Sequence, residues 1–131
     1  MIMSTVSDFA TGLQHIGVPT NDMEASKQFY LSLGFSIALD TYNKEEHVVF
    51  FRLGNLTMEV YENHQATLTP GAVDHVCINV TDVEKALERT KDLGYEPIEG
   101  GIQFLPFWEN GVRYFTIYGP NREKIEFGQY L

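Results

Sequence analysis

The chain has 131 residues, enough for one domain with a sizeable core or for two small modules sharing one. Its net charge of −9 argues against non-specific binding to nucleic acid and against docking on anionic lipid. No apolar run approaches the roughly 20 residues of a membrane span, and residues 1–12 lack the basic start and apolar stretch of a signal peptide. The single cysteine, Cys77, cannot form an internal disulfide, which predicts a soluble protein of the reducing cytoplasm.

An internal repeat organises the chain. A shift of 60 residues aligns LQHIGVPTNDMEASKQFYLSLGF with VDHVCINVTDVEKALERTKDLGY. The identical pairs are His15 with His75, Asp22 with Asp82, Glu24 with Glu84, Leu33 with Leu93 and Gly34 with Gly94. The later parts align more loosely at an offset of 67, which matches Glu59 with Glu126. We therefore expect one domain over residues 1–131, composed of module 1 (13–62), a linker (63–72) and module 2 (73–131).

Module 1 is predicted to contain a strand, a helix and three further strands. The first strand, over about 13–19, is followed by Asn21 and Asp22, either of which can cap a helix. Gly34 comes just after the last helical turn, where a left-handed residue is common. The remaining strands are expected at about 35–42, 46–53 and 56–62.

Module 2 repeats these signals, with Asp82 and Gly94 bracketing its helix. Its later strands are expected at about 95–98, 111–118 and 123–130. Segment 100–108, which module 1 lacks, holds Phe104, Phe107 and Trp108 between glycine and proline residues. This segment fits either plain core or the lid or wall of a pocket. The overall pattern predicts an α+β fold of two tandem βαβββ modules.

Alternation along the strands puts four titratable residues on the sheet faces away from the helices. These residues are His15, Glu59, His75 and Glu126. Each alone would more often be a structural histidine or a solvated glutamate, so the prediction rests on their matched positions in the repeat. Two imidazoles and two carboxylates on one inner surface would be costly without a cation among them. Such a set suits a divalent metal ion: Zn²⁺, Ni²⁺, Co²⁺, Mn²⁺ or Fe²⁺.

Other side chains on the strands are candidates for lesser roles. Arg52 and Arg113 are the cations best placed to meet an anionic group of a substrate, although such residues more often pair with surface carboxylates. Phe107 and Trp108 are the candidate pocket wall. Cys77 shares the strand face of His75, and we interpret it as a small buried core residue.

The quoted repeat, together with LTMEVYE and GPNREKIEFGQ, resembles the vicinal oxygen chelate superfamily over nearly the whole chain. That superfamily includes glyoxalase I, fosfomycin-resistance proteins, methylmalonyl-CoA epimerase, extradiol dioxygenases and bleomycin-binding proteins. The resemblance implies paired modules whose curled mixed sheets form a metal-binding cup, in which the metal chelates adjacent oxygens of a small substrate. It also implies a homodimer, with the cup formed either within one chain or across two.

The ligand pattern helps to choose a branch of this superfamily. Glyoxalase I-like members use His or Gln, then Glu, His and Glu, which is similar to His15, Glu59, His75 and Glu126 position for position. Extradiol dioxygenases and fosfomycin transferases lack the ligand at the position of Glu59, and bleomycin-binding members have generally lost the set. The resemblance therefore implies lyase or isomerase chemistry of the lactoylglutathione lyase type.

In that chemistry a carboxylate moves a proton between adjacent carbons, and Glu126 is the first candidate for this base, with Glu59 as the second. Pro19 stands where glyoxalase I usually has an arginine that contacts glutathione, which argues against glutathione as a cosubstrate. Two alternatives remain open: a dioxygenase or antibiotic-modifying enzyme, and a non-catalytic protein that binds small molecules.

Overall fold

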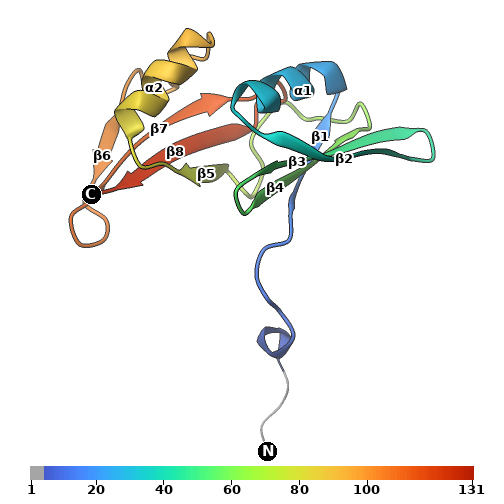
Figure 1. Cartoon of the computed structure of the whole chain (residues 1–131), viewed down its shortest axis with the longest axis horizontal. Helices are drawn as coiled ribbons and strands as arrows, with labels where there is room; N and C mark the ends of the chain where they lie inside the picture. Colours follow the sequence, from blue (N-terminus) through green and yellow to red (C-terminus); the bar gives the residue numbers. More distant parts are fainter. Residues whose placement is uncertain (1–4) are drawn as a thin grey trace, which may run out of the picture.

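A computed structural model describes residues 5–131. Residues 1–4 lie outside it, so the prediction that residues 1–12 are no signal peptide falls partly outside the described chain. The described part of the chain begins with a segment that projects away from the body and contains a short 3₁₀ helix (Val6–Asp8) (Figure 1). From Ile16 onward the order of one strand, one helix and three strands occurs twice, which confirms the predicted α+β fold of paired βαβββ modules.

Module 1 forms a four-stranded mixed sheet covered by one helix. Its elements are β1 (Ile16–Thr20), α1 (Met23–Ser32), β2 (Ser36–Asn43), β3 (Glu46–Leu53) and β4 (Leu56–Glu62). The strand order is β1-β4-β3-β2, in which β1 runs parallel to β4 and the other neighbours are antiparallel. The last strand of the module therefore pairs with the first and closes the unit.

Module 2 repeats this topology. Its elements are β5 (His75–Asn79), α2 (Val83–Asp92), β6 (Gln103–Leu105), β7 (Val112–Tyr118) and β8 (Lys124–Tyr130), and its strand order is β5-β8-β7-β6. Figure 1 shows α1 and α2 on the same side of the two sheets, which lie next to each other and leave their opposite faces uncovered. The two sheets are not closed into a cup within one chain. In the described part of the chain, neither helix is long and apolar enough to cross a membrane.

The helix starts show how closely the two modules match. Asp22 accepts a hydrogen bond from the N–H of Ala25 at 3.1 Å, and Asp82 accepts one from Lys85 at 3.0 Å, as the sequence predicts for N-caps. In each module, a side chain at the end of the last strand also accepts from the first N–H of the helix. The N–H of Met23 donates to Glu62 Oε2 at 2.6 Å, and the N–H of Val83 donates to Gln129 Oε1 at 2.8 Å.

The predicted strand at 95–98 is wrong. The equivalent strand is β6 (Gln103–Leu105), which lies inside the segment that seemed to have no counterpart in module 1. Pro97 lacks the N–H that a strand ladder needs, and Gly100 has φ +86, so this segment makes a single backbone hydrogen bond to β7, from Ile98 to Thr116 at 2.8 Å, and then turns. The aromatic segment therefore begins as an edge strand and continues as a loop at the end of the sheet.

One apolar core joins the two modules. It contains Tyr30 and Phe51 of module 1 and Phe115 and Ile117 of module 2, all completely buried. Hydrogen bonds support the same junction: the hydroxyl of buried Tyr30 donates to Glu123 Oε2 at 2.9 Å. Burial, and then the charge of Glu123, raise the pKa of Tyr30 well above its usual value, so the phenol stays a donor.

A surface ion cluster on β2 gives the fold a predictable pH dependence. Hydrogen bonds from His47 (2.7 Å) and Lys27 (3.0 Å) lower the pKa of Asp40 below the usual value of an aspartate. A lowered carboxyl pKa stabilises the fold above the unfolded-state pKa, and this stabilisation is lost as the pH falls through the folded-state value.

We therefore expect Asp40→Asn to lower the free energy of unfolding at pH 7 by at most about 1 kcal/mol, because the group is partly exposed and screened by solvent. Urea titrations of both proteins should show this difference shrinking below about pH 4. A difference that stays constant down to pH 2 would contradict the ionic origin. Glu45→Gln, on the exposed turn after β2, is the matched control and should change little at any pH.

Candidate metal centre

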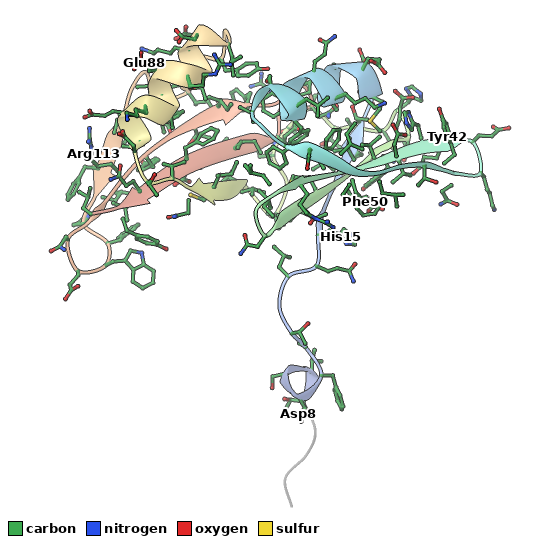
Figure 2. All side chains as sticks on the ribbon, viewed as in Figure 1. Asp8, His15, Tyr42, Phe50, Glu88 and Arg113 are labelled. Atoms are coloured by element: carbon green, nitrogen blue, oxygen red, sulfur yellow. The ribbon has the colours of Figure 1, made fainter. Side chains whose placement is uncertain are left out.

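The first half of the candidate centre lies on the uncovered face of module 1. His15 directly precedes β1, and Glu59 in β4 pairs with Gly17. The Nε2 atom of His15 is 3.5 Å from Glu59 Oε1, and its imidazole meets the ring of Phe50 edge-on at 5.8 Å. Figure 2 shows His15 and Phe50 on the side of the sheet opposite α1. The structure therefore brings this predicted pair together.

The second half occupies the equivalent place on module 2. His75 begins β5, and its Nε2 atom is 2.9 Å from Glu126 Oε2 in β8. On the other side of the same ring, Nδ1 is 3.1 Å from Asp74, whose second oxygen is 3.4 Å from Lys124 Nζ. The hydrogen bond from His75, and then Lys124, lower the pKa of Asp74. This neighbour therefore remains an ionised acceptor for the imidazole.

Both histidines are oriented by the residue before them. The Nδ1 atom of His15 lies 2.8 Å from the side-chain oxygen of Gln14, just as Nδ1 of His75 lies next to Asp74. Gln14 and Asp74 occupy the same position of the repeat. An acceptor at Nδ1 fixes the ring so that Nε2 points at the glutamate, which is the usual arrangement of a histidine that binds a metal through Nε2. A cation can take the place of the Nε2 proton between imidazole and carboxylate.

The four predicted ligands meet as two pairs and not as one group of four. Within residues 5–131, no three or more His, Cys, Asp or Glu side chains are placed to hold a metal ion together. His15 and His75 both line a cleft of about 670 Å³, which residues of the connecting segment such as Thr67 and Pro70 also line. The edge strands β1 and β5 belong to separate sheets. One chain thus presents two half-centres, His15–Glu59 and His75–Glu126.

Cys77 differs from its predicted role as a buried core residue. It is exposed on edge strand β5 and pairs with Glu126 in β8, so it belongs to the face of the second half-centre. The thiol itself lies over Gly128, where a Cβ would come within 2.9 Å of the sulfur. Partial burial, and then the charge of Glu126, raise the pKa of Cys77 to about 11. The thiol is therefore protonated at neutral pH when no metal ion is bound.

The two predicted substrate-binding arginines lie on opposite faces. Arg52 shares the face of Glu59, and its Nε donates to Thr57 Oγ1 at 3.4 Å. Arg113 instead donates to Glu84 of α2 at 3.0 Å, and Figure 2 shows it beside that helix. The structure therefore does not support a substrate contact by Arg113. The sequence already indicated this placement. Side chains alternate along a strand, so Arg113 shares the helix-side face of buried Phe115, while Tyr114 lies on the opposite face.

Several residues of the site face were missed by the sequence reasoning. Thr116 pairs directly with Glu126, and Tyr114 lies next to it along the same face of β7. Tyr61 flanks the first half-centre, with its ring 3.4 Å from the place where a Cβ of Gly17 would be. Counting in steps of two from each glutamate across the paired strands would have identified these residues.

The two residues predicted to form a pocket wall lie beside the second half-centre. Phe107 lies in the loop between β6 and β7 and lines two cavities that also contact Glu126. Trp108 follows it, and its ring meets that of Tyr130 edge-on with centroids 6.0 Å apart. Both are exposed side chains and contribute nothing to the core, which excludes the plain-core interpretation of these two residues.

Comparison with known proteins identifies the family. Residues 12–127 match the Glyoxalase/Bleomycin resistance protein/Dioxygenase superfamily. The chain belongs to this superfamily. Its members are commonly enzymes that act on small molecules, and they bind divalent metal ions. The match covers both modules and confirms the resemblance seen in the sequence.

Individual relatives match this chain in sequence or in fold across almost their whole length. The uncharacterized protein YwbC of Bacillus subtilis is 29% identical over 92% of this chain and 98% of its own. A glyoxalase family protein from Enterococcus faecalis superimposes with a TM-score of 0.77 at 19% identity, covering 92% of this chain and 98% of that one. The fosfomycin resistance protein FosX of Listeria monocytogenes, in complex with Mn(II) and sulfate, superimposes with a TM-score of 0.67 at 17% identity. The superposition covers 93% of this chain and 94% of that one.

Proposed function

We propose that the protein is a metal-dependent lyase or isomerase of the glyoxalase type, which moves a proton between adjacent carbons of a small oxygenated substrate. The observation that supports this most directly is the matched pair of half-centres. Each holds an imidazole by its Nδ1 atom and aims Nε2 at a glutamate. Two imidazoles and two carboxylates are a suitable donor set for Zn²⁺, Ni²⁺, Co²⁺, Mn²⁺ or Fe²⁺.

A homodimer would complete the centre. Each chain offers its two half-centres on the uncovered faces of separate sheets, and one chain alone does not join them. We propose that His15 and Glu59 of one chain meet His75 and Glu126 of a second chain, so that a symmetric dimer holds two complete centres. Bringing these groups together without a cation would place two carboxylates against each other, so metal binding and assembly should support each other.

The residues of the chain have separate tasks in this reaction. A bound divalent ion supplies Lewis acidity towards adjacent substrate oxygens. Gln14 and Asp74 keep the two imidazoles in place, while Glu126 takes the proton from one carbon and returns it to the next. Glu126 suits this role because its side chain is only 19% exposed yet borders two cavities, so a substrate carbon can approach its oxygens.

The isosteric variant Glu126→Gln tests the role of the base. We expect it to retain bound metal through its amide oxygen and the other donors, while activity falls by a factor of about 100 or more, because the amide cannot accept the proton. Metal content is measured by elemental analysis of the purified protein. Activity is measured with methylglyoxal, alone and with glutathione or another thiol, across the five divalent ions, with solvent deuterium to follow the transferred proton.

Glu109→Gln is the matched control, since Glu109 is exposed in the same module. It should behave as wild type in both measurements. Full activity of Glu126→Gln would rule out Glu126 as the base. A wild-type protein that binds its small molecules but turns none over with any ion would identify a binding protein in place of an enzyme.

A further inference from the structure

A network of buried polar side chains joins module 1 to the turn between β7 and β8. It consists of Thr20, Ser26 and Tyr30 from module 1 and of Asn121 and Glu123 from module 2, and it is called here the junction network. Thr20, Ser26 and Tyr30 are completely buried, and Asn121 is 9% exposed. Polar groups at this depth are costly unless they are hydrogen-bonded, so the network favours one specific arrangement of its members.

Asn121 is the residue that links the two modules in this network. Its side-chain oxygen accepts from Thr20 Oγ1 at 3.0 Å, and its Nδ2 atom donates to Ser26 Oγ at 3.2 Å. Because Thr20 ends β1 and Ser26 lies in the first half of α1, one amide group holds both the strand and the helix of module 1. Glu123 supports it, since its Oε1 accepts from the N–H of Asn121 at 2.8 Å and its Oε2 accepts from the Tyr30 hydroxyl at 2.9 Å.

A second contact between the modules lies at the other end of α1. The hydroxyl groups of Ser32 and Tyr95 are 2.7 Å apart, and the ring of Phe29 meets that of Tyr95 edge-on with centroids 5.2 Å apart. Ser26 and Ser32 are separated by six residues, which is about 9 Å along a helix. Two contacts at this separation prevent module 1 from rotating about either of them, so the two sheets keep one relative orientation.

The junction network is next to the cleft between the two half-centres. Asn121 and Glu123 line the same cleft of about 670 Å³ that His15 and His75 line. β1 starts directly after His15 and ends at Thr20, while Glu123 directly precedes β8, the strand that pairs with β5. A shift at this junction would therefore change the position of one histidine relative to the other.

We propose that Asn121, with the junction network around it, is a positioning residue for the metal centre. By fixing the relative orientation of the two sheets, it holds the His15–Glu59 and His75–Glu126 half-centres of each chain in the positions that a complete centre needs. A chain that is held in this way loses less conformational freedom when an ion binds, so it binds the ion more tightly. This inference rests on the proposed function for the presence of the ion, whereas the orientation of the sheets can be measured without any metal.

Asn121→Ala breaks the network with little risk to the fold, because Thr20 and Ser26 still bond each other at 2.9 Å. Thr90→Val is the matched control, since Thr90 is also buried but its hydroxyl donates to the Leu87 carbonyl at 3.0 Å within module 2. Calorimetric titration of the full chain with Mn²⁺ gives the affinities. We expect the Kd for Mn²⁺ to rise at least about tenfold in Asn121→Ala and to stay within about twofold of wild type in Thr90→Val. The visible absorption of bound Co²⁺, which reports ligand geometry, should change in Asn121→Ala alone.

Pulsed electron paramagnetic resonance measures the orientation of the sheets directly. Spin labels are attached through Glu45→Cys in the exposed turn after β2 and Glu88→Cys on α2 (Figure 2), in a Cys77→Ser background without metal and diluted with unlabelled chain. We expect a narrow distribution of distances in this protein and in its Thr90→Val form, and a broader one when Asn121→Ala is added. An unchanged distribution in Asn121→Ala, or an unchanged affinity for Mn²⁺, would overturn the proposal.

The two proposals fail in different ways. A protein whose distance distribution broadens in Asn121→Ala, but which binds no divalent ion as wild type, would show that the junction network orients the sheets and would reject the proposed metal-dependent reaction. A protein whose activity depends on Glu126, but whose metal affinity does not depend on Asn121, would keep the proposed reaction and reject the positioning role.

Discussion

Two inactive variants of this chain are expected to restore each other when they share a dimer. The first carries His15→Ala and Glu59→Ala, the second His75→Ala and Glu126→Ala. Each alone lacks one half-centre on every chain, so neither homodimer can form a complete centre. If the centre combines module 1 of one chain with module 2 of the other, as proposed above, a mixed dimer has one centre with all four ligands and one with none.

Coexpression with two different affinity tags isolates the mixed dimer. We expect about one metal ion per mixed dimer, compared with about two in the wild-type dimer and none in either double variant, and about half of the wild-type activity. Mixing the two purified variants under conditions that prevent subunit exchange is the control and should restore nothing. A mixed dimer that binds no metal would show that each centre is built within a single chain.

Truncation of Phe115 to alanine is expected to lower the free energy of unfolding by about 3–5 kcal/mol. Its ring is completely buried and stacks on Phe127 with centroids 5.0 Å apart, so alanine leaves a cavity that the surrounding strands cannot fill. For a domain of this size the loss is a large part of the total stability of about 5–15 kcal/mol. The effect is measured by urea denaturation, followed by far-UV circular dichroism and by Trp108 fluorescence.

Because one core spans both modules, we expect a single unfolding transition that moves as a whole in Phe115→Ala. Phe9→Ala is the control, and its exposed ring should cost no more than about 0.5 kcal/mol. A curve with two steps, of which only one moves, would show that the two modules unfold separately.

The local signals of the sequence were sufficient for most of the fold. Asp22 and Asp82 cap the helices as predicted, and Gly34 and Gly94 have the left-handed φ values of +99 and +92 that end them. These features depend on a few neighbouring residues, so they can be recognised without knowledge of the rest of the chain. The prediction of a strand at 95–98 failed because Pro97 has no N–H to donate, so the segment bonds to β7 only through Ile98 and forms no continuous ladder.

The candidate site was predictable only in part. Strand alternation correctly put each histidine and its glutamate on the face away from the helices, since that rule acts within one sheet. It could not say how the two sheets lie relative to each other, because their relative position depends on contacts between modules such as that of Tyr30 with Glu123. The separation of the four ligands into two half-centres therefore depends on tertiary contacts between the modules, and it cannot be predicted from the sequence pattern of either module alone.

The pairing of the first strand with the last in each module determines which parts of the fold can move apart as intact units. Every β-ladder in residues 5–131 is complete within its own module, so two modules can separate or exchange partners without breaking a ladder hydrogen bond. A given module 1 is held to a given module 2 by the shared apolar core, by hydrogen bonds such as that of Tyr30 with Glu123, and by the chain between Glu62 and His75. A change in the length of that connection would leave every strand in register, so it could change which module 2 a given module 1 packs against without altering either sheet.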